Sequence, residues 1–121
     1  MSGQVPINKF GSLVSTSIED ETEAVFANLA AVLRASGSSL NKVLKVTVFL
    51  THMEDFARMN SVFEKHFSVH KPARSCVAVR ELPRGVSVVI ECIAVEDSAP
   101  GKTPGETAEY ALLSPPPPDF P

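Results

Sequence analysis

The chain has 121 residues, of which 44% are hydrophobic and 21% charged, a balance typical of one globular domain. Its formal net charge of −3 argues against a nucleic-acid partner, because proteins that bind nucleic acids usually neutralise the phosphates with a basic face. No apolar run approaches the roughly 20 residues that a membrane-spanning helix needs, so we expect no membrane partner either.

The beginning of the chain and its cysteines bear on the cellular compartment. The first ten residues, MSGQVPINKF, match neither a secretory signal peptide nor a mitochondrial presequence. Cys76 and Cys92 both lie in strand-like runs, so a disulfide framework is not expected. These features predict a reducing compartment, the cytoplasm, or the mitochondrion if a leader is missing from the sequence.

Two segments of the chain differ in composition. Residues 1–96 have the pattern of a folded domain, whereas residues 97–121 contain seven of the ten prolines, including the run Pro115–Pro118. A proline run favours an extended segment without a core of its own. We expect a flexible tail, which either has no partner or is a ligand for a proline-recognising module.

Two segments of the folded part have helical spacing. Residues 17–36 predict an amphipathic helix, with a capping box at Thr16 and Glu19 and a stop at Gly37. Residues 54–67 predict a second helix. The apolar side of this second helix comprises Phe56, Met59, Phe63 and Phe67.

Three segments predict strands. Residues 43–51 are rich in β-branched side chains, and residues 73–80 and 86–95 have similar patterns. Pro83 and Gly85 are turn residues, so the last two strands are expected to form an antiparallel hairpin. The resulting fold class is α+β, with a mixed sheet and both helices packed on one face.

The alternation of side chains along a strand predicts the two faces of this sheet. In a hairpin, the apolar residues of the last two strands lie on the same face of the sheet when Val77 pairs with Val88. The same register places Arg74 near Glu91 on the other face. The covered face then comprises Ser75, Val77, Val79, Val88, Ile90, Cys92 and Ala94, together with Leu44, Val46, Val48 and Leu50 of the first strand. The second face comprises Arg74 and Glu91 among Phe49, Val89, Ile93 and Val95. Since both helices cover the first face, we expect other copies of the chain to bury the second; a half-solvated face is the alternative.

Arg74 and Glu91 are the residues best suited to chemistry. A guanidinium binds a carboxylate through two parallel hydrogen bonds, a geometry that lysine cannot reproduce. A carboxylate nearby can position water and transfer protons. The alternative is a cross-strand ion pair that contributes less than about 1 kcal/mol.

Several runs of the sequence resemble the Rid (YjgF-type) family. They are PARSCV at 72–77, LP at 82–83, IECIAV at 90–95, SGQVPI at 2–7, KVTVFL at 45–50 and the stretch 56–60. The resemblance covers residues 2–96 and is more specific than any one motif. It implies a chorismate-mutase-like fold, a homotrimer, and sites in the clefts between subunits.

The resemblance also implies roles for individual residues. Arg74 would bind the carboxylate of the substrate, and Glu91 would hold the attacking water or assist proton transfer. The backbone around Cys76, together with Ser2 and Gly3, would complete the pocket. Asn60 matches an asparagine near the cleft. Neither a cofactor nor a metal is implied.

The chain departs from the family pattern at its beginning. Members resembling it usually have an opening β-hairpin before the SGQ segment, with a tyrosine that lines the pocket. The only tyrosine here is Tyr110. The interpretation is either that the sequence is truncated or that the tail substitutes for the missing strands.

Other candidate sites have weaker patterns. Cys76 could be a nucleophile, but no histidine and asparagine partners are readable, and cysteines in strands are usually small core residues. His66 and His70 have a spacing that suits a metal, but a helix end explains two histidines equally well, and no third ligand follows. No glycine-rich phosphate loop is present, which argues against a nucleotide cofactor.

The leading hypothesis is therefore an enamine and imine deaminase, a hydrolase that converts 2-iminobutanoate and 2-iminopropanoate to 2-keto acids and ammonia. A second hypothesis is a non-catalytic trimer that binds metabolites or acts as a chaperone. A third is an endoribonuclease, an activity described for some members, which the acidic composition disfavours.

Overall fold

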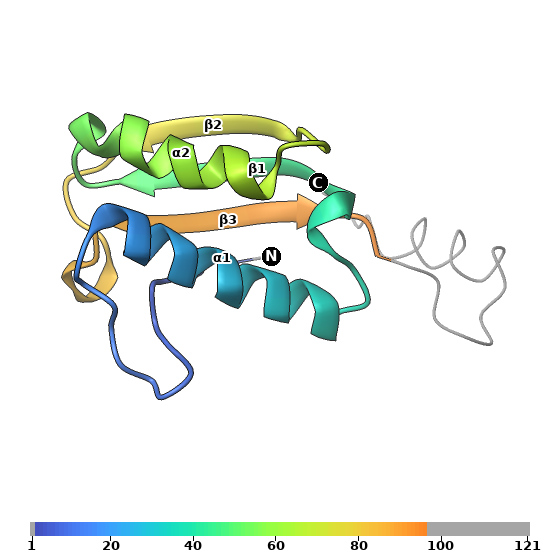
Figure 1. The fold of residues 1–121 in the computed structure, drawn as a ribbon, viewed down its shortest axis with the longest axis horizontal. Helices are drawn as coiled ribbons and strands as arrows, with labels where there is room; N and C mark the ends of the chain where they lie inside the picture. The colour runs from blue at the N-terminus through green and yellow to red at the C-terminus, as the bar shows by residue number, and fades with distance from the viewer. Residues whose placement is uncertain (1, 97–121) are drawn as a thin grey trace, which may run out of the picture.

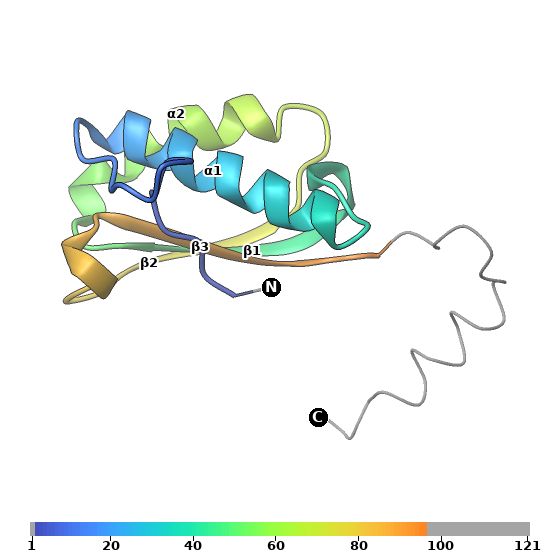
Figure 2. The same cartoon turned by 90° about the horizontal axis from the view of Figure 1, so that it is seen from below.

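The computed structural model describes residues 2–96. The strands β1 (Val43–Leu50), β2 (Ala73–Ala78) and β3 (Val88–Ala94) form one sheet in the order β2-β1-β3. The helices α1 (Ile18–Ala35) and α2 (Phe56–His66) lie side by side over one face of it (Figure 1 and Figure 2). This confirms the α+β architecture with two helices on one face. The predicted tail, residues 97–121, lies outside the described residues.

The first helix starts one residue later than its predicted capping box. Ser17 is the capping residue, and its side chain accepts a hydrogen bond of 3.0 Å from the Asp20 amide. The hydroxyl of Thr16 instead donates to the Asp20 carboxylate at 2.6 Å. The capping box of Thr16 and Glu19 was therefore wrong by one position, because the chain is still extended at Ser17. The predicted stop is confirmed, since Gly37 has a φ of 81°, which few other residues tolerate.

The predicted hairpin of the last two strands is wrong. β2 pairs with β1 in parallel, and β3 pairs with the other edge of β1 in antiparallel orientation. β2 ends at Ala78 and β3 begins at Val88, so residues 79–87 connect them. A connection of this length can cross from one edge of the sheet to the other, which a tight turn at Pro83 and Gly85 could not.

One residue of the central strand faces away from its predicted side. Leu44 was expected in the core, but it is 56% exposed, whereas Val43 is fully buried. The pairing with β3 shifts between Val43 and Lys45, so a bulge changes the alternation there. From Val46 onward the prediction holds, and Val46, Val48 and Leu50 are fully buried.

The core lies between the two helices and the covered face of the sheet. Phe26 of α1 is fully buried and packs edge-on against Phe63 of α2 and Phe67, with ring centroids 5.9 and 5.7 Å away. The imidazole of His66 stacks on the same ring, with 4.5 Å between the centroids. The helix-covered half of the molecule is therefore built around one aromatic cluster.

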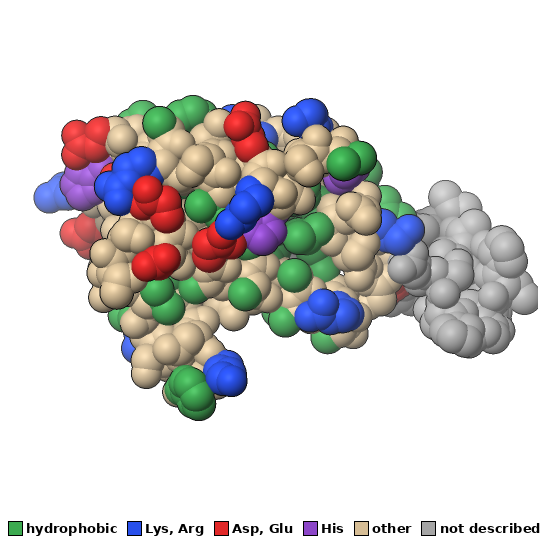
Figure 3. Space-filling view, in the orientation of Figure 1, with side chains coloured by type: hydrophobic (Ala, Val, Ile, Leu, Met, Phe, Trp, Pro, Cys, Tyr) green, Lys and Arg blue, Asp and Glu red, His purple; other side chains and the backbone are tan. Residues whose placement is uncertain are grey.

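Ion pairs join the outer surfaces of the two helices. Arg58 of α2 donates two hydrogen bonds, of 3.0 and 2.7 Å, to the Glu19 carboxylate of α1. One turn further along α1, the Glu23 carboxylate contacts both Lys65 and His66 of α2. In Figure 3 acidic and basic side chains are interspersed over this face, and no large patch of one sign is visible. A phosphate backbone would find no basic surface on this side of the molecule.

The Glu23 pair predicts a pH dependence of stability. Hydrogen bonds from Lys65 and His66 lower the pKa of Glu23 below its usual value of 4.5. A carboxyl group with a lowered pKa stabilises the fold above that value, and the contribution is lost as the pH falls through the folded pKa. We expect Glu23→Gln to lower the free energy of unfolding at pH 7 by less than about 1 kcal/mol, since the pair is partly exposed.

The difference between wild type and Glu23→Gln should shrink as the pH falls from about 4.5 downward, which urea titrations followed by circular dichroism can measure. Glu54→Gln is the matched control, because Glu54 is exposed and has no recorded ion pair in the described part of the chain. A constant difference between pH 7 and pH 3 would contradict the assigned role of Glu23.

Candidate functional site

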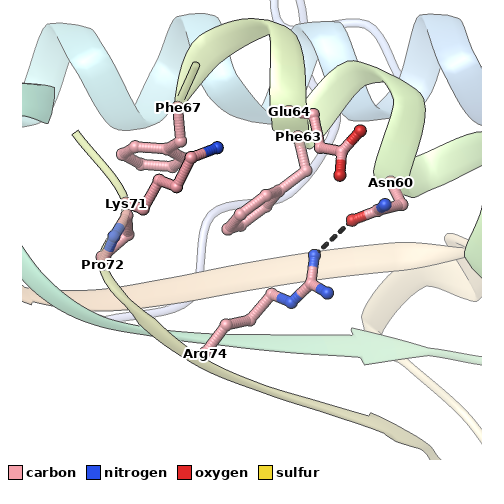
Figure 4. A pocket seen from close by; sticks show the side chains of 7 residues that line it. All are labelled: Asn60, Phe63, Glu64, Phe67, Lys71, Pro72 and Arg74. Carbon is pink, nitrogen blue, oxygen red and sulfur yellow. Dashed lines mark hydrogen bonds between the residues drawn. The ribbon is translucent and has the colours of Figure 1, made fainter. Parts of the chain in front are cut away.

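Arg74 extends from β2 toward α2, on the side of the sheet that the helices cover. Its guanidinium donates a hydrogen bond to the side-chain oxygen of Asn60. The guanidinium carbon lies 4.5 Å from the ring centroid of Phe63 and 5.2 Å from that of Phe56. Figure 4 shows Arg74 reaching from the strand toward α2, with Phe63 and Asn60 near the end of its side chain. Arg74 and Asn60, two of the predicted site residues, are thus in direct contact.

The guanidinium borders a pocket of about 290 Å³ between α2 and the start of β2. Its lining consists of Asn60, Phe63, Glu64, Phe67, Lys71, Pro72 and Arg74. Arg74 and Lys71 are cationic, Glu64 is acidic, and two residues are aromatic, so the pocket has one more positive than negative charge together with apolar walls. A small molecule with a carboxylate and a short apolar side chain fits these properties.

Cys76 lies two residues beyond Arg74 on the same side of β2 and is half-buried. Burial raises the pKa of its thiol, and the neighbouring Arg74 only partly opposes this effect. A nucleophilic cysteine requires a lowered pKa, so this environment argues against a thiolate. Cys76 therefore does not fit a nucleophile, and it is not among the residues that line the pocket.

Glu91 points to the opposite face of the sheet, contrary to the prediction from alternation. In the observed register Arg74 pairs with Val46, whose side chain faces the helices. Glu91 pairs with Thr47, the next residue of β1, whose side chain faces the other way. The predicted proximity of Arg74 and Glu91 within one chain is wrong, because it depended on the hairpin that does not form.

Gly3 and the chain around it lie beside Glu91 rather than beside Arg74. Gln4 and Ile90 exchange backbone hydrogen bonds of 2.8 and 3.3 Å, which hold the first residues along the edge of β3. A Cβ at Gly3 would lie 2.7 Å from a methyl group of Val89, so only glycine permits this approach. Val89 shares the face of Glu91, and Ser2 continues the same segment.

The candidate residues thus form two groups. Arg74, Asn60 and Cys76 lie under α2 at the β2 edge, which has no neighbouring strand within residues 2–96. Glu91, Gly3 and Ser2 lie at β3 and its edge. Within that same range the carboxylate of Glu91 has no recorded hydrogen bond or ion pair. Each group alone supplies only part of the predicted site.

The uncovered face of the sheet is apolar around Glu91. Val77 is 43% exposed, and Ile93 is 61% exposed, which is high for strand residues of this type. Neither α1 nor α2 lies on this side (Figure 2). An uncovered, mixed face is therefore present as expected, but the two sides of β2 are exchanged: Val77, expected on the covered face, lies on it, and Arg74 does not. Its burial against other copies stays a prediction.

The two histidines considered as a metal pair have other partners. His66 contacts the Glu23 carboxylate at 2.7 Å, and His70 bonds to the backbone oxygen of Val43. No group of three metal-ligating side chains occurs among the described residues.

Within residues 2–96, no helix is both long enough and apolar enough to cross a membrane.

Sequence reasoning missed the role of two aromatic rings. Phe56 and Phe63 were assigned to the buried side of the second helix, which is correct for Phe63 at 7% exposure. Both rings also contact the Arg74 guanidinium. Their spacing with Asn60, at positions 56, 60 and 63, places all three on one side of α2. The sequence shows this spacing, but it does not show that these side chains face β2.

Comparison with known proteins gives consistent matches over the described part of the chain. Residues 1–96 match the profile of the family described as endoribonuclease L-PSP. Protein HMF1 of Saccharomyces cerevisiae is 51% identical over 96 residues, which are 79% of this chain and 74% of that protein. Reactive Intermediate Deaminase A, chloroplastic, of Arabidopsis thaliana is 41% identical over 88 residues, which are 73% of this chain and 47% of that protein.

A solved structure extends the likeness to a protein with a small ligand. The crystal structure of Escherichia coli TdcF with bound serine has a TM-score of 0.74 and 37% sequence identity. The match covers 79% of this chain and 78% of TdcF. The likeness therefore extends over most of both chains.

Proposed function

Since the chain belongs to the Rid (YjgF-type) family, whose profile is described as endoribonuclease L-PSP, we propose that it hydrolyses enamines and imines derived from amino acids. The substrates are 2-iminobutanoate and 2-iminopropanoate, and the products are 2-keto acids and ammonia. The observation that carries this proposal is the guanidinium of Arg74, which borders a small pocket and is held there by Asn60.

The proposed reaction needs only orientation and charge. Arg74 binds the substrate carboxylate through two parallel hydrogen bonds. Water adds to the imine carbon while the nitrogen gains a proton, and the resulting carbinolamine loses ammonia as its hydroxyl group becomes the carbonyl. Glu91 accepts a proton from the attacking water and returns it to the leaving nitrogen. The reaction is balanced by one water in and one ammonia out, so no cofactor is required.

In this proposal each active site is shared by two copies of the chain. Arg74 and Glu91 project from opposite faces of one sheet, so one chain cannot direct both at the same substrate. A second copy can bring its Glu91, with Gly3 and Ser2 beside it, to the pocket that Arg74 borders. The uncovered apolar face supports such packing, and a closed ring of three copies would complete three equal sites.

A complementation experiment tests this arrangement. Arg74→Ala and Glu91→Gln are each expected to be nearly inactive alone in an assay of ammonia release from 2-iminobutanoate. When the two variants are co-expressed with different tags and purified as mixed trimers, one of the three sites in each ring, about a third of all sites, combines an intact Arg74 with an intact Glu91. We therefore expect mixed oligomers to recover a substantial fraction of the wild-type rate.

The matched control carries both substitutions in one chain, co-expressed with wild type. A site formed between a doubly substituted chain and a wild-type chain lacks either Arg74 or Glu91. Such sites should be inactive, so all activity of this control should come from sites between two wild-type chains. A complete lack of recovery in the mixed variants, together with normal oligomer mass, would refute the shared site. Inactivity of the wild type toward both imines would refute the deaminase itself.

Two alternatives remain distinguishable by experiment. A non-catalytic metabolite-binding or chaperone-like protein would gain thermal stability with 2-keto acids yet release no ammonia. The family description names an endoribonuclease, but the charge mixture in Figure 3 offers no basic surface for RNA on that face. RNA cleavage that persists through purification and is abolished by Arg74→Ala would favour that activity.

A cytoplasmic location, with the mitochondrion as the alternative, is likewise proposed and can be tested by imaging the tagged protein in cells.

A further inference from the structure

Three residues of one helix, α2, contact the guanidinium of Arg74. Phe63 lies 4.5 Å and Phe56 5.2 Å from its central carbon, measured to the ring centroids. Asn60, between the two rings on α2, accepts a hydrogen bond from one of its terminal nitrogens. Figure 4 shows Phe63 and Asn60 on either side of the end of the Arg74 side chain.

Such contacts limit the freedom of the guanidinium without using up its donors. A ring that stacks on a guanidinium attracts the positive charge through its face. The five N–H groups lie in the guanidinium plane, and only one is recorded here in a hydrogen bond with the described residues. The remaining donors can form a two-bond contact with a carboxylate, and an ordered side chain loses less entropy when that contact forms.

We propose that Phe56 and Phe63 are positioning residues that orient the Arg74 guanidinium for a carboxylate, so that ring contacts on α2 set the affinity of the site for its acidic ligand. The inference rests on the proposed function for the identity of that ligand, a 2-imino or 2-keto acid. It assigns to α2 a role in binding that its apolar side chains alone would not suggest.

Phe56 is the better of the two positions for a test. It is half-buried at the start of α2, whereas Phe63 is part of the aromatic cluster and its loss would disturb the core. We expect Phe56→Leu to weaken binding of 2-oxobutanoate, measured by calorimetry, by about three- to thirtyfold, the range of a cation–π contact. Phe56→Tyr, which keeps an aromatic face, should retain nearly wild-type affinity.

Two further comparisons separate orientation of Arg74 from a general effect on the fold. In an Arg74→Ala background, Phe56→Leu should have no further effect on the affinity, because no guanidinium remains to be oriented. Binding of 2-oxobutanamide, the uncharged amide of the same acid, should not change with Phe56→Leu. The side-chain Nε–H of Arg74 should also become more mobile in Phe56→Leu, as nuclear magnetic relaxation would detect.

Phe26→Leu is the matched control, since Phe26 belongs to the same aromatic cluster but has no recorded contact with the guanidinium within residues 2–96. It should lower stability and leave the affinity for 2-oxobutanoate unchanged. The inference is overturned if Phe56→Leu leaves affinity unchanged, if its effect persists without Arg74, or if 2-oxobutanoate binds Arg74→Ala as tightly as wild type.

These outcomes are independent of turnover. Binding that depends on both Arg74 and Phe56, in a protein that releases no ammonia from imines, would refute the proposed function and support the inference. Ammonia release with no coupling between the two residues would do the reverse.

Discussion

Replacing Arg74 by alanine is expected to lower kcat/KM for 2-iminobutanoate by about two to four orders of magnitude. The reason is the loss of two charge-assisted hydrogen bonds to the substrate carboxylate, each contributing about 1.5–3 kcal/mol, where 1.4 kcal/mol corresponds to a factor of ten. Arg74→Lys should recover only part of this loss, since a single ammonium cannot reproduce the planar fork. Initial rates of ammonia release, with the imine generated in place by a dehydratase, would measure both variants.

Arg58→Ala is the control for this experiment. Arg58 also lies on the helix side, but its guanidinium bonds to Glu19 on the outer surface rather than bordering the pocket. Its loss should leave kcat/KM unchanged. A decrease of less than threefold in Arg74→Ala, with an unchanged circular dichroism spectrum, would remove Arg74 from the reaction.

Replacing Phe26 by alanine is expected to reduce the free energy of unfolding by about 3–5 kcal/mol, the usual cost of removing a large buried ring. Phe26 is fully buried and contacts Phe63, His66 and Phe67, so the cavity would lie at the centre of the aromatic cluster. Because a domain has a total stability of only about 5–15 kcal/mol, this variant should be marginal at 37 °C. Urea titrations followed by circular dichroism would measure the change, since the chain contains no tryptophan.

Phe10→Ala provides the comparison, because Phe10 is 80% exposed. Its replacement should change the free energy of unfolding by no more than about 0.5 kcal/mol. A cost below about 1 kcal/mol for Phe26→Ala would mean that the cluster repacks and that Phe26 is not central to the core.

Only part of the candidate site was accessible to sequence reasoning. The family motifs single out Arg74 and Glu91 as candidates by residue type, and the structure brings Asn60, another candidate, into contact with Arg74. The prediction that Arg74 and Glu91 share one face failed, and so did the hairpin behind it. The rings of Phe56 and Phe63 were expected only to pack in the core, because their contact with Arg74 depends on how α2 packs against β2, which the spacing along α2 does not define.

Local pattern alone was enough to define both helices, the three strands, and the covered side of β3 and of β1 from Val46 onward, because these depend on residues only a few positions apart. The neighbours of each strand depend instead on contacts between distant segments. The same apolar alternation in β2 suits a hairpin with β3 or a parallel pairing with β1, and the two differ in which side Arg74 faces. Tertiary packing decided this, because β1, fully buried at Val46, Val48 and Leu50, occupies the centre of the sheet and separates the strands of Arg74 and Glu91.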